Sequence, residues 1–152
     1  MKLETTIIPQ TEMGGISLNS NIYETINLLS REYYIVDIAE NAIDIDNGML
    51  TLYYDIDDYL ISMISCNKDF NGKYKNKLWA GMTVLDVIKN SKTQLAWSGF
   101  VEIDGIKGIG LPLPDDFDDF DDFDDFDDFD DFESITDHLD YSFVFDKLYI
   151  YK

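Results

Sequence analysis

The chain has 152 residues, of which 45% are hydrophobic, and its formal net charge is −20 because 31 acidic side chains outnumber 11 basic ones. A chain of this length can bury enough apolar surface to fold as one domain, so we expect a single domain over residues 1–152. The sequence has no apolar run near the roughly 18 residues of a membrane span, and Cys66 alone cannot form an intramolecular disulfide. The first residues lack the apolar stretch of a secretory signal, so we expect a cytoplasmic protein.

Much of the negative charge lies in one segment. Residues 115–132 are six consecutive Asp-Asp-Phe triplets with 12 Asp, which leaves 19 acidic and 11 basic side chains elsewhere, a net charge of −8. A negative field repels nucleic acid and anionic lipid and attracts basic surfaces. We therefore expect a cationic partner, no nucleic acid and no membrane.

The first half of the chain predicts one helix followed by strands. Apolar residues at helical spacing follow capping candidates at positions 19–21, which predicts a helix of about ten residues that ends at Arg31. Asp46-Asn47-Gly48 suits a hairpin turn because Asn and Gly tolerate positive φ, and residues 55–58 predict another turn. The expected strands are 33–38, 42–45, 49–54 and 59–65.

The second half predicts the same order after a polar segment. Residues 67–77 hold four of the 11 basic side chains and predict an exposed loop. Thr83 and Asp86 have the spacing of a capping box, and the apolar residues that follow predict a second short helix. Turns are expected at 98–99 and 104–105. The expected strands are 95–97, 100–103, 106–113 and 147–151.

Short matches between the halves predict an internal repeat. The matched segments are 21–26 with 83–88, 48–52 with 99–103, and 58–61 with 146–149. They define pseudo-repeats of about 14–66 and 78–152, each too short to bury a large core separately. The expected fold class is α+β: two helix-plus-antiparallel-strand repeats that share one sheet, with both helices on one face.

Candidate catalytic residues have simpler structural interpretations. His138, the single histidine, lies in a polar context that suits a loop or helix end, and Cys66 ends an apolar strand, as a core thiol would. Gly105, Gly108 and Gly110 lie within strand-like sequence and not between a strand and a helix, which indicates turn and bulge glycines in place of a phosphate cradle. We expect no enzyme activity, no catalytic residue and no cofactor.

Part of the first hairpin resembles a calcium loop. Asp44 and Asp46 have the required spacing, but Gly48 is at the fifth position where the sixth is needed, and Asp55 stands in place of the bidentate Glu. A hairpin turn explains the pattern more simply, so no metal site is expected. An acidic cation-binding protein or nucleic-acid mimic is the alternative function, and a hydrolase that uses paired Asp is a third.

The Asp-Asp-Phe segment has a period of three, which suits neither a helix nor a strand. A polyproline II conformation, with three residues per turn, would align its six Phe in one stripe. One interpretation is an acidic-aromatic arm that binds a basic cleft; the other is a passive loop enlarged by repeat slippage in the coding DNA. The residues expected to contact a partner are Asp115, Asp116, Phe117, Asp118, Asp119, Phe120, Asp121, Asp122 and Phe123.

Three segments outside this insertion carry a family resemblance. KYKNKLWAGMTVLDVI (73–88), GFVEIDGIKGIG (99–110) and FDKLYI (145–150) resemble small immunity proteins of bacterial polymorphic-toxin systems of the contact-dependent, type VI or Rhs type. The expected tandem build is also similar to that of beta-lactamase inhibitory protein. The resemblance implies an antitoxin that binds a cognate toxin domain and blocks its active site or substrate access. It implies no catalytic residues, and the Asp-Asp-Phe triplets depart from the family pattern.

Deletion of residues 115–132 is expected to leave a folded protein, because the first half manages the corresponding connection with the short 55–58 turn. If the arm contacts the partner, the deletion weakens binding and makes it less dependent on salt, since exposed charges are screened by ions. Circular dichroism, and titrations at two salt concentrations, measure both effects. Loss of cooperative unfolding would contradict the expectation for the fold, and unchanged affinity would identify a passive loop.

Overall fold

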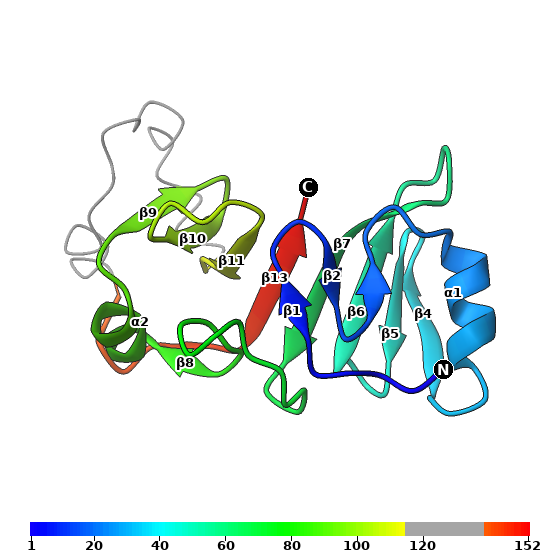
Figure 1. Cartoon of the computed structure of the whole chain (residues 1–152), viewed down its shortest axis with the longest axis horizontal. Coiled ribbons are helices and arrows are strands. Elements are labelled where there is room, and N and C mark those ends of the chain that lie inside the picture. The colour runs from blue at the N-terminus through cyan, green and yellow to red at the C-terminus, as the bar shows by residue number, and fades with distance from the viewer. Residues whose placement is uncertain (115–138) are drawn as a thin grey trace.

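An eight-stranded antiparallel sheet is the central element of the computed structural model, which describes residues 1–114 and 139–152 (Figure 1). The strand order is β4-β5-β6-β7-β13-β11-β10-β9, so strands from the first half of the chain occupy one side and strands from the second half the other. The mixed helix and strand content confirms the α+β class. The strands are β4 (Ile35–Ala39), β5 (Ala42–Ile45), β6 (Leu50–Tyr54), β7 (Ile61–Asn67), β9 (Gln94–Trp97), β10 (Phe100–Ile103), β11 (Ile109–Pro112) and β13 (Lys147–Tyr151).

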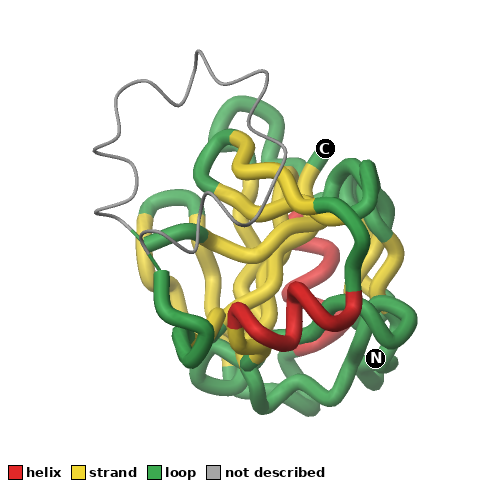
Figure 2. Tube along the Cα trace, turned by 90° about the vertical axis from the view of Figure 1, so that its left-hand side faces the viewer, coloured by secondary structure: helices red, strands yellow, loops and turns green. Residues whose placement is uncertain are grey.

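Two short helices begin at side-chain caps, as the sequence predicts. The Asn21 side chain accepts hydrogen bonds from the first backbone N–H groups of α1 (Ile22–Leu29). Thr83 and Asp86 form a reciprocal capping box at α2 (Val84–Asn90). Helix α1 ends two residues before the expected Arg31, where Ser30 caps it. Seen along the long axis of the molecule, the two helices lie one behind the other (Figure 2).

Two smaller sheets were not predicted from the sequence. The N-terminal sheet consists of β1 (Ile7–Ile8), β2 (Glu12–Met13) and β3 (Ile16–Ser17), and β2 lies against β7 of the large sheet. The other pairs β8 (Met82–Thr83) with β12 (Val144–Phe145). Strands of two residues are too short to show an alternating pattern, so only their tertiary pairing reveals them.

The core lies on one face of the large sheet. Leu52, Ile64, Ile150 and Ile109 occupy paired positions on four adjacent strands, and all are fully buried. Cys66 is also fully buried, which confirms the prediction of a core thiol, and burial raises the pKa of this thiol to about 12.

The predicted turns form as expected. Asp46, Asn47 and Gly48 have φ of 49°, 59° and 90°, values that Asn, Asp and Gly adopt at least cost. The two-residue turns Ser98-Gly99 and Asp104-Gly105 also have positive φ at both positions. Local turn chemistry therefore sets three of the connections in the large sheet.

Two sequence expectations on strands and loops were wrong in part. The strand expected over 106–113 begins only at Ile109, because Ile106 closes a turn by donating its N–H to Ile103 and Gly108 has a φ of 79°. The loop expected over 67–77 is not wholly exposed. Its Phe70 is only 7% exposed, and that ring leaves no room for a side chain at position 72.

One expected repeat match, between segments 48–52 and 99–103, falls at unequal positions in the large sheet. Segment 48–52 contributes β6, the third strand that the first half adds to the large sheet. Segment 99–103 contributes β10, the second strand that the other half adds to it. Counted inward from the two edges of the sheet, β10 and β5 are each the second strand. The match between 21–26 and 83–88 fits better, since Asn21 and Thr83 both serve as helix caps.

Each half ties its helix cap to the segment that leads into its last strand. In the first half Asn21 bridges to Leu60, and the N–H of Ile22 donates to the carbonyl of Tyr59 at 2.9 Å. In the second half Thr83 pairs with Val144, and the N–H of Val84 donates to the carbonyl of Phe143 at 3.0 Å.

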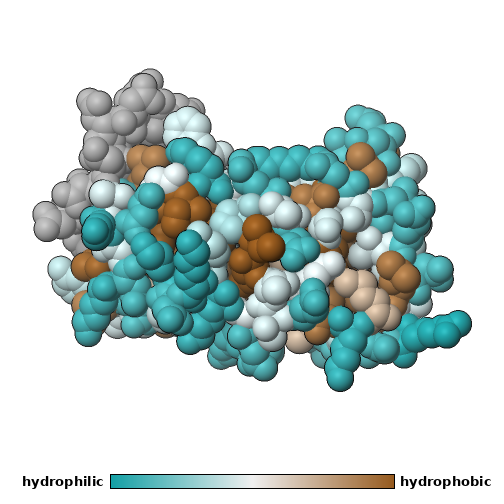
Figure 3. Space-filling view, in the orientation of Figure 1, coloured by the Kyte–Doolittle hydropathy of each residue, from teal (hydrophilic) through white to brown (hydrophobic). Residues whose placement is uncertain are grey.

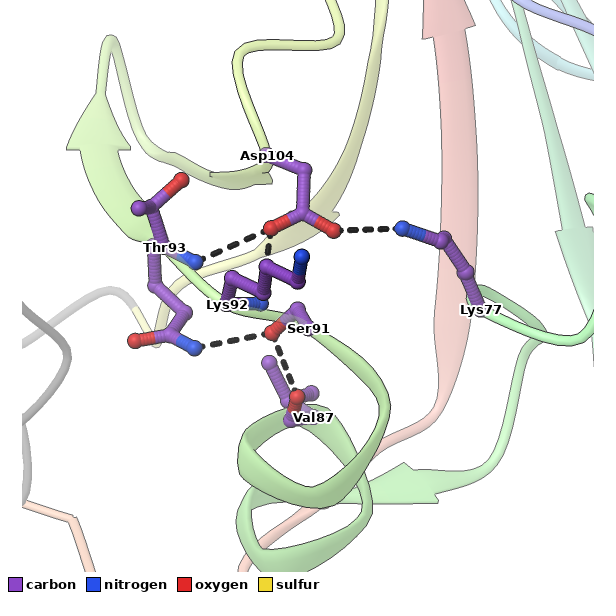
Figure 4. A network of polar contacts seen from close by, with 7 residues as sticks. Lys77, Val87, Ser91, Lys92, Thr93 and Asp104 are labelled. Carbon is purple, nitrogen blue, oxygen red and sulfur yellow. Dashed lines mark hydrogen bonds and ion pairs between the residues drawn. The ribbon is translucent and has the colours of Figure 1, made fainter.

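One aspartate in each half closes a hairpin: Asp46 follows β5 of the hairpin β4–β5, and Asp104 follows β10 of the hairpin β9–β10. The N–H of Asp46 donates to Tyr34, whose own N–H returns a bond to the Asp46 carboxylate, both at 2.8 Å. Asp104 makes the same exchange with Thr93 and adds an ion pair of 2.6 Å to Lys77 (Figure 4). Burial acts to raise the pKa of Asp104, but the hydrogen bonds from Lys77 and from the Thr93 and Lys92 N–H groups lower it overall.

Asp104→Asn tests this ion pair. Asn tolerates the positive φ of the turn and its Oδ1 still accepts the two backbone bonds, so what is lost is the charge and the hydrogen bond from Lys77. Because Lys77 is partly solvated, we expect a loss of about 0.5–1 kcal/mol at neutral pH, or roughly 2–4 °C in Tm. Because folding lowers the pKa of Asp104, its carboxylate stabilises the fold at pH values above the unfolded-state pKa. This stabilisation is lost as the pH falls through the folded-state pKa, so the Tm difference between Asp104→Asn and the native protein should vanish in strong acid.

Thermal melts across this pH range measure the effect, and Asp46→Asn is the matched control. Asp46 makes no ion pair within residues 1–114 and 139–152, so its substitution should cost less. A Tm difference for Asp104→Asn that is equally large in strong acid would contradict the assignment.

Candidate protein-binding face

Aromatic side chains gather on the face of the large sheet that points away from the core. Successive residues of a strand point to opposite faces, so the burial of Leu148 and Ile150 in the core directs Tyr149 and Tyr151 to the other side. The same alternation places Tyr53 of β6 and Phe100 of β10 on that side. We call Tyr53, Phe100, Tyr149 and Tyr151 the aromatic face.

The four rings come from β6, β13 and β10 and form a continuous chain of ring contacts. The ring centroids of Tyr53 and Tyr149 are 6.1 Å apart, those of Tyr149 and Phe100 are 5.3 Å apart, and those of Phe100 and Tyr151 are 4.8 Å apart. The last pair is stacked. Such pairs contribute roughly 0.5–1.5 kcal/mol beyond the area they bury, so the rings hold one another in position.

Gly110 of β11 allows the stacked pair to form. A Cβ at this position would lie 2.8 Å from the Cβ of Phe100 and 2.9 Å from the hydroxyl of Tyr151. The aromatic rings thus occupy the space of the missing side chain. The sequence predicted a turn or bulge glycine here, whereas the structure shows a strand glycine covered by rings.

Polar side chains accompany the rings on this side of the sheet. The Tyr151 hydroxyl donates to Glu102 at 2.6 Å, and Thr51 donates to Asp44 at 2.7 Å. Burial, followed by the hydrogen bond to Glu102, raises the pKa of Tyr151 well above its ordinary value. Burial, followed by a hydrogen bond with Tyr53, does the same for Tyr149. The face therefore presents neutral phenols with polar tips, a composition typical of protein interfaces.

The exposed indole of Trp97 extends the apolar character toward one edge of the sheet. Trp97 is 50% exposed, lies on edge strand β9 and pairs with Phe100. Its position in the ladder puts it on the side of the aromatic face. Large aromatic residues such as Trp and Tyr are among the types that supply most of the binding energy in known interfaces.

The end of the molecule formed by the first half is acidic. Residues 32–67 contain eight acidic side chains and no Lys or Arg. Tyr23, Tyr54 and Tyr59 cluster there, with ring centroids 5.2 and 6.4 Å apart between neighbours. Burial, then the neighbouring tyrosines and the carboxylates of Asp37 and Glu40, raise the pKa of Tyr54. This end would attract a cationic molecule from a distance.

The side of the molecule seen in Figure 3 has a different surface. Its apolar side chains form several separate patches among hydrophilic ones. Scattered apolar side chains are ordinary on a protein surface. In the described part of the chain, no three His, Cys, Asp or Glu residues are grouped as metal ligands, and no helix is long and apolar enough to cross a bilayer.

The site residues expected from the sequence are not those of this face. Residues 115–123 and His138 lie outside the described residues, so their roles stay predictions. The sequence-based analysis missed the aromatic face, although alternation in 147–151 and 100–103 could have placed Tyr149, Tyr151 and Phe100 on one side. It could not have shown that β10 and β13 both flank β11.

Comparisons of the chain with protein-family models, curated proteins and solved structures found no match.

Gly110→Ala tests the packing of the aromatic face. The added methyl group must displace Phe100 or Tyr151, and overpacking of this kind costs about 1–3 kcal/mol. We expect a lower Tm and an altered near-ultraviolet circular dichroism spectrum. Gly105→Asn is the control, since a Cβ there meets no atom within 4 Å and Asn accepts its φ of 69°. Equal spectra and Tm values for Gly110→Ala and the native protein would refute this packing.

Proposed function

We propose that this chain acts by binding and not by catalysis: it is an immunity protein that neutralises a cognate bacterial toxin domain by covering its active site or substrate entrance. The aromatic face is the single observation that carries the proposal. The sequence resemblance to immunity proteins of polymorphic-toxin systems supplies the class of partner.

The geometry of the aromatic face supports a role in binding. Its rings are half-buried and held by one another, so little side-chain entropy is lost when a partner covers them. Tyrosine combines a large apolar ring with a hydroxyl that can bond across an interface, which explains its enrichment at binding hot spots.

The charge distribution supports a cationic partner. The acidic end supplies a field that speeds encounter, while the aromatic face supplies contact area. Toxin domains that act on nucleic acids or nucleotides carry basic clefts, because phosphate binding needs Lys and Arg. A toxin of this kind fits both features.

The finer architecture belongs to the same proposal: the two halves are copies of one unit that share the large sheet. The equivalent roles of Asn21 and Thr83, and of Asp46 and Asp104, support this interpretation. The closing strands β7 and β13 would then be equivalent. A duplicated unit doubles the width of the sheet and so provides a broad surface from a short sequence.

The proposed function predicts that a toxin-like domain is encoded beside this gene, and coexpression with that domain tests it. The native chain should restore growth of cells that produce the domain and should bind it directly. Tyr53→Ala and Tyr149→Ala should each weaken binding by about 2 kcal/mol, or roughly thirtyfold, if they are hot spots. Calorimetry measures the affinities, and thermal melts establish that the variants are folded.

Tyr141→Ala is the matched control, because Tyr141 is exposed and lies beside the start of α2, where its carbonyl accepts the N–H of Leu85. It should bind and protect as the native chain does. The proposal fails if the native chain neither binds nor protects, or if folded variants of Tyr53 and Tyr149 retain full affinity.

A further inference from the structure

A pocket lies beside the aromatic face, between the edge hairpin β9–β10 and the turn that follows it. Its volume is about 290 Å³, and its lining residues are Thr93, Gln94, Leu95, Glu102, Gly105 and Lys107. This volume is at the lower limit for small-molecule sites, so the space suits one long side chain better than a drug-sized ligand. A Cβ added at Gly105 would meet no atom within 4 Å, so the pocket is open beside this residue.

Glu102 is the unusual member of the lining. Its side chain is only 4% exposed, and buried carboxylates are rare unless they are paired. Tyr151 donates to one carboxylate oxygen at 2.6 Å, and the Lys107 ammonium lies 3.4 Å from the other. Within residues 1–114 and 139–152, this group meets two donors and no acceptor, as an ionised carboxylate requires.

Lys107 satisfies this charge only loosely. Its side chain is 63% exposed, and the 3.4 Å contact is long for a charge-assisted hydrogen bond. Because Glu102 is buried, its carboxylate would be left uncompensated if Lys107 simply moved away, so Lys107 leaves at small cost only when another cation takes its place. The Oε1 atom of Glu102 would then be open to another cation.

We propose that this pocket accepts the guanidinium group of an arginine side chain, which displaces Lys107 and bonds to Glu102. Leu95 provides an apolar wall for the methylene stem of the arginine, and Thr93 adds a polar group at the rim. A guanidinium is more weakly hydrated than an ammonium and presents several donors in a fixed plane, so it gains more from a partly buried carboxylate.

The pocket joins the aromatic face through Tyr151, whose ring stacks on Phe100 while its hydroxyl holds Glu102. As part of an interface, the pocket would select a partner that offers an arginine next to an apolar contact area. This use of the pocket rests on the proposed function; the affinity for arginine does not.

The test uses the full chain and N-acetyl-L-arginine amide as the probe, followed by NMR of the backbone amides. N-acetyl-L-citrulline amide, which has nearly the same shape and no charge, is the control ligand. We expect the arginine probe to shift the amides of Leu95, Gly105 and Lys107 at millimolar concentrations and the citrulline probe to leave them unchanged.

Three variants separate the contributions. Glu102→Gln keeps the bond from Tyr151 but removes the charge, and should weaken binding by about tenfold or more. Lys107→Ala removes the competing cation and should strengthen binding severalfold. Asp44→Asn, which changes a carboxylate on the same side of the sheet outside the pocket, should leave the affinity unchanged.

Equal binding of citrulline, undiminished binding by Glu102→Gln, weaker binding by Lys107→Ala, or no amide shift at tens of millimolar probe would each overturn the proposal. Failure of the toxin-binding function would leave these ligand titrations unaffected. Conversely, if the chain neutralises a toxin but does not bind the arginine probe, the proposed function stands and the proposal for this pocket fails.

Discussion

The antiparallel pairing of β7 with β13 joins the two halves of the sheet, and the rest of the structure depends on it. Five residue pairs form this ladder, from Asn67 with Lys147 to Met63 with Tyr151. On its inner face Ile64, Cys66, Leu148 and Ile150 are fully buried, so strand pairing and apolar burial stabilise each other. Without the ladder both central strands would become edges with unpaired backbone groups.

The same pairing creates the aromatic face. It sets Tyr149 opposite Ser65 at the middle of the sheet, within ring contact of Tyr53 from the first half and Phe100 from the second. Phe100, Tyr149 and Tyr151 contact one another within the second half, and the contact of Tyr149 with Tyr53 extends the aromatic face across the central ladder. The complete face therefore requires both halves to be folded, which couples the proposed function to the stability of the whole sheet.

Local chemistry in the sequence predicted the features that depend on near neighbours. The caps at Asn21 and Thr83 and the turns at Asp46 and Asp104 follow from side-chain hydrogen bonding and tolerance of positive φ, and all were confirmed. The two-residue strands and the rings above Gly110 depend on partners far apart in the chain, which no local pattern reveals. The expected contact residues 115–123 lie outside the described residues, and their role stays a prediction.

Hydroxyl-radical footprinting of the chain with the toxin domain that we propose it neutralises tests the central claim most directly, because it reports which aromatic side chains a partner covers. The account predicts that oxidation of Tyr53, Phe100 and Tyr149 falls in the complex, while that of exposed Tyr141, beside the start of α2, stays as in the free protein. Protection of Tyr141 with no protection of the aromatic face would contradict it.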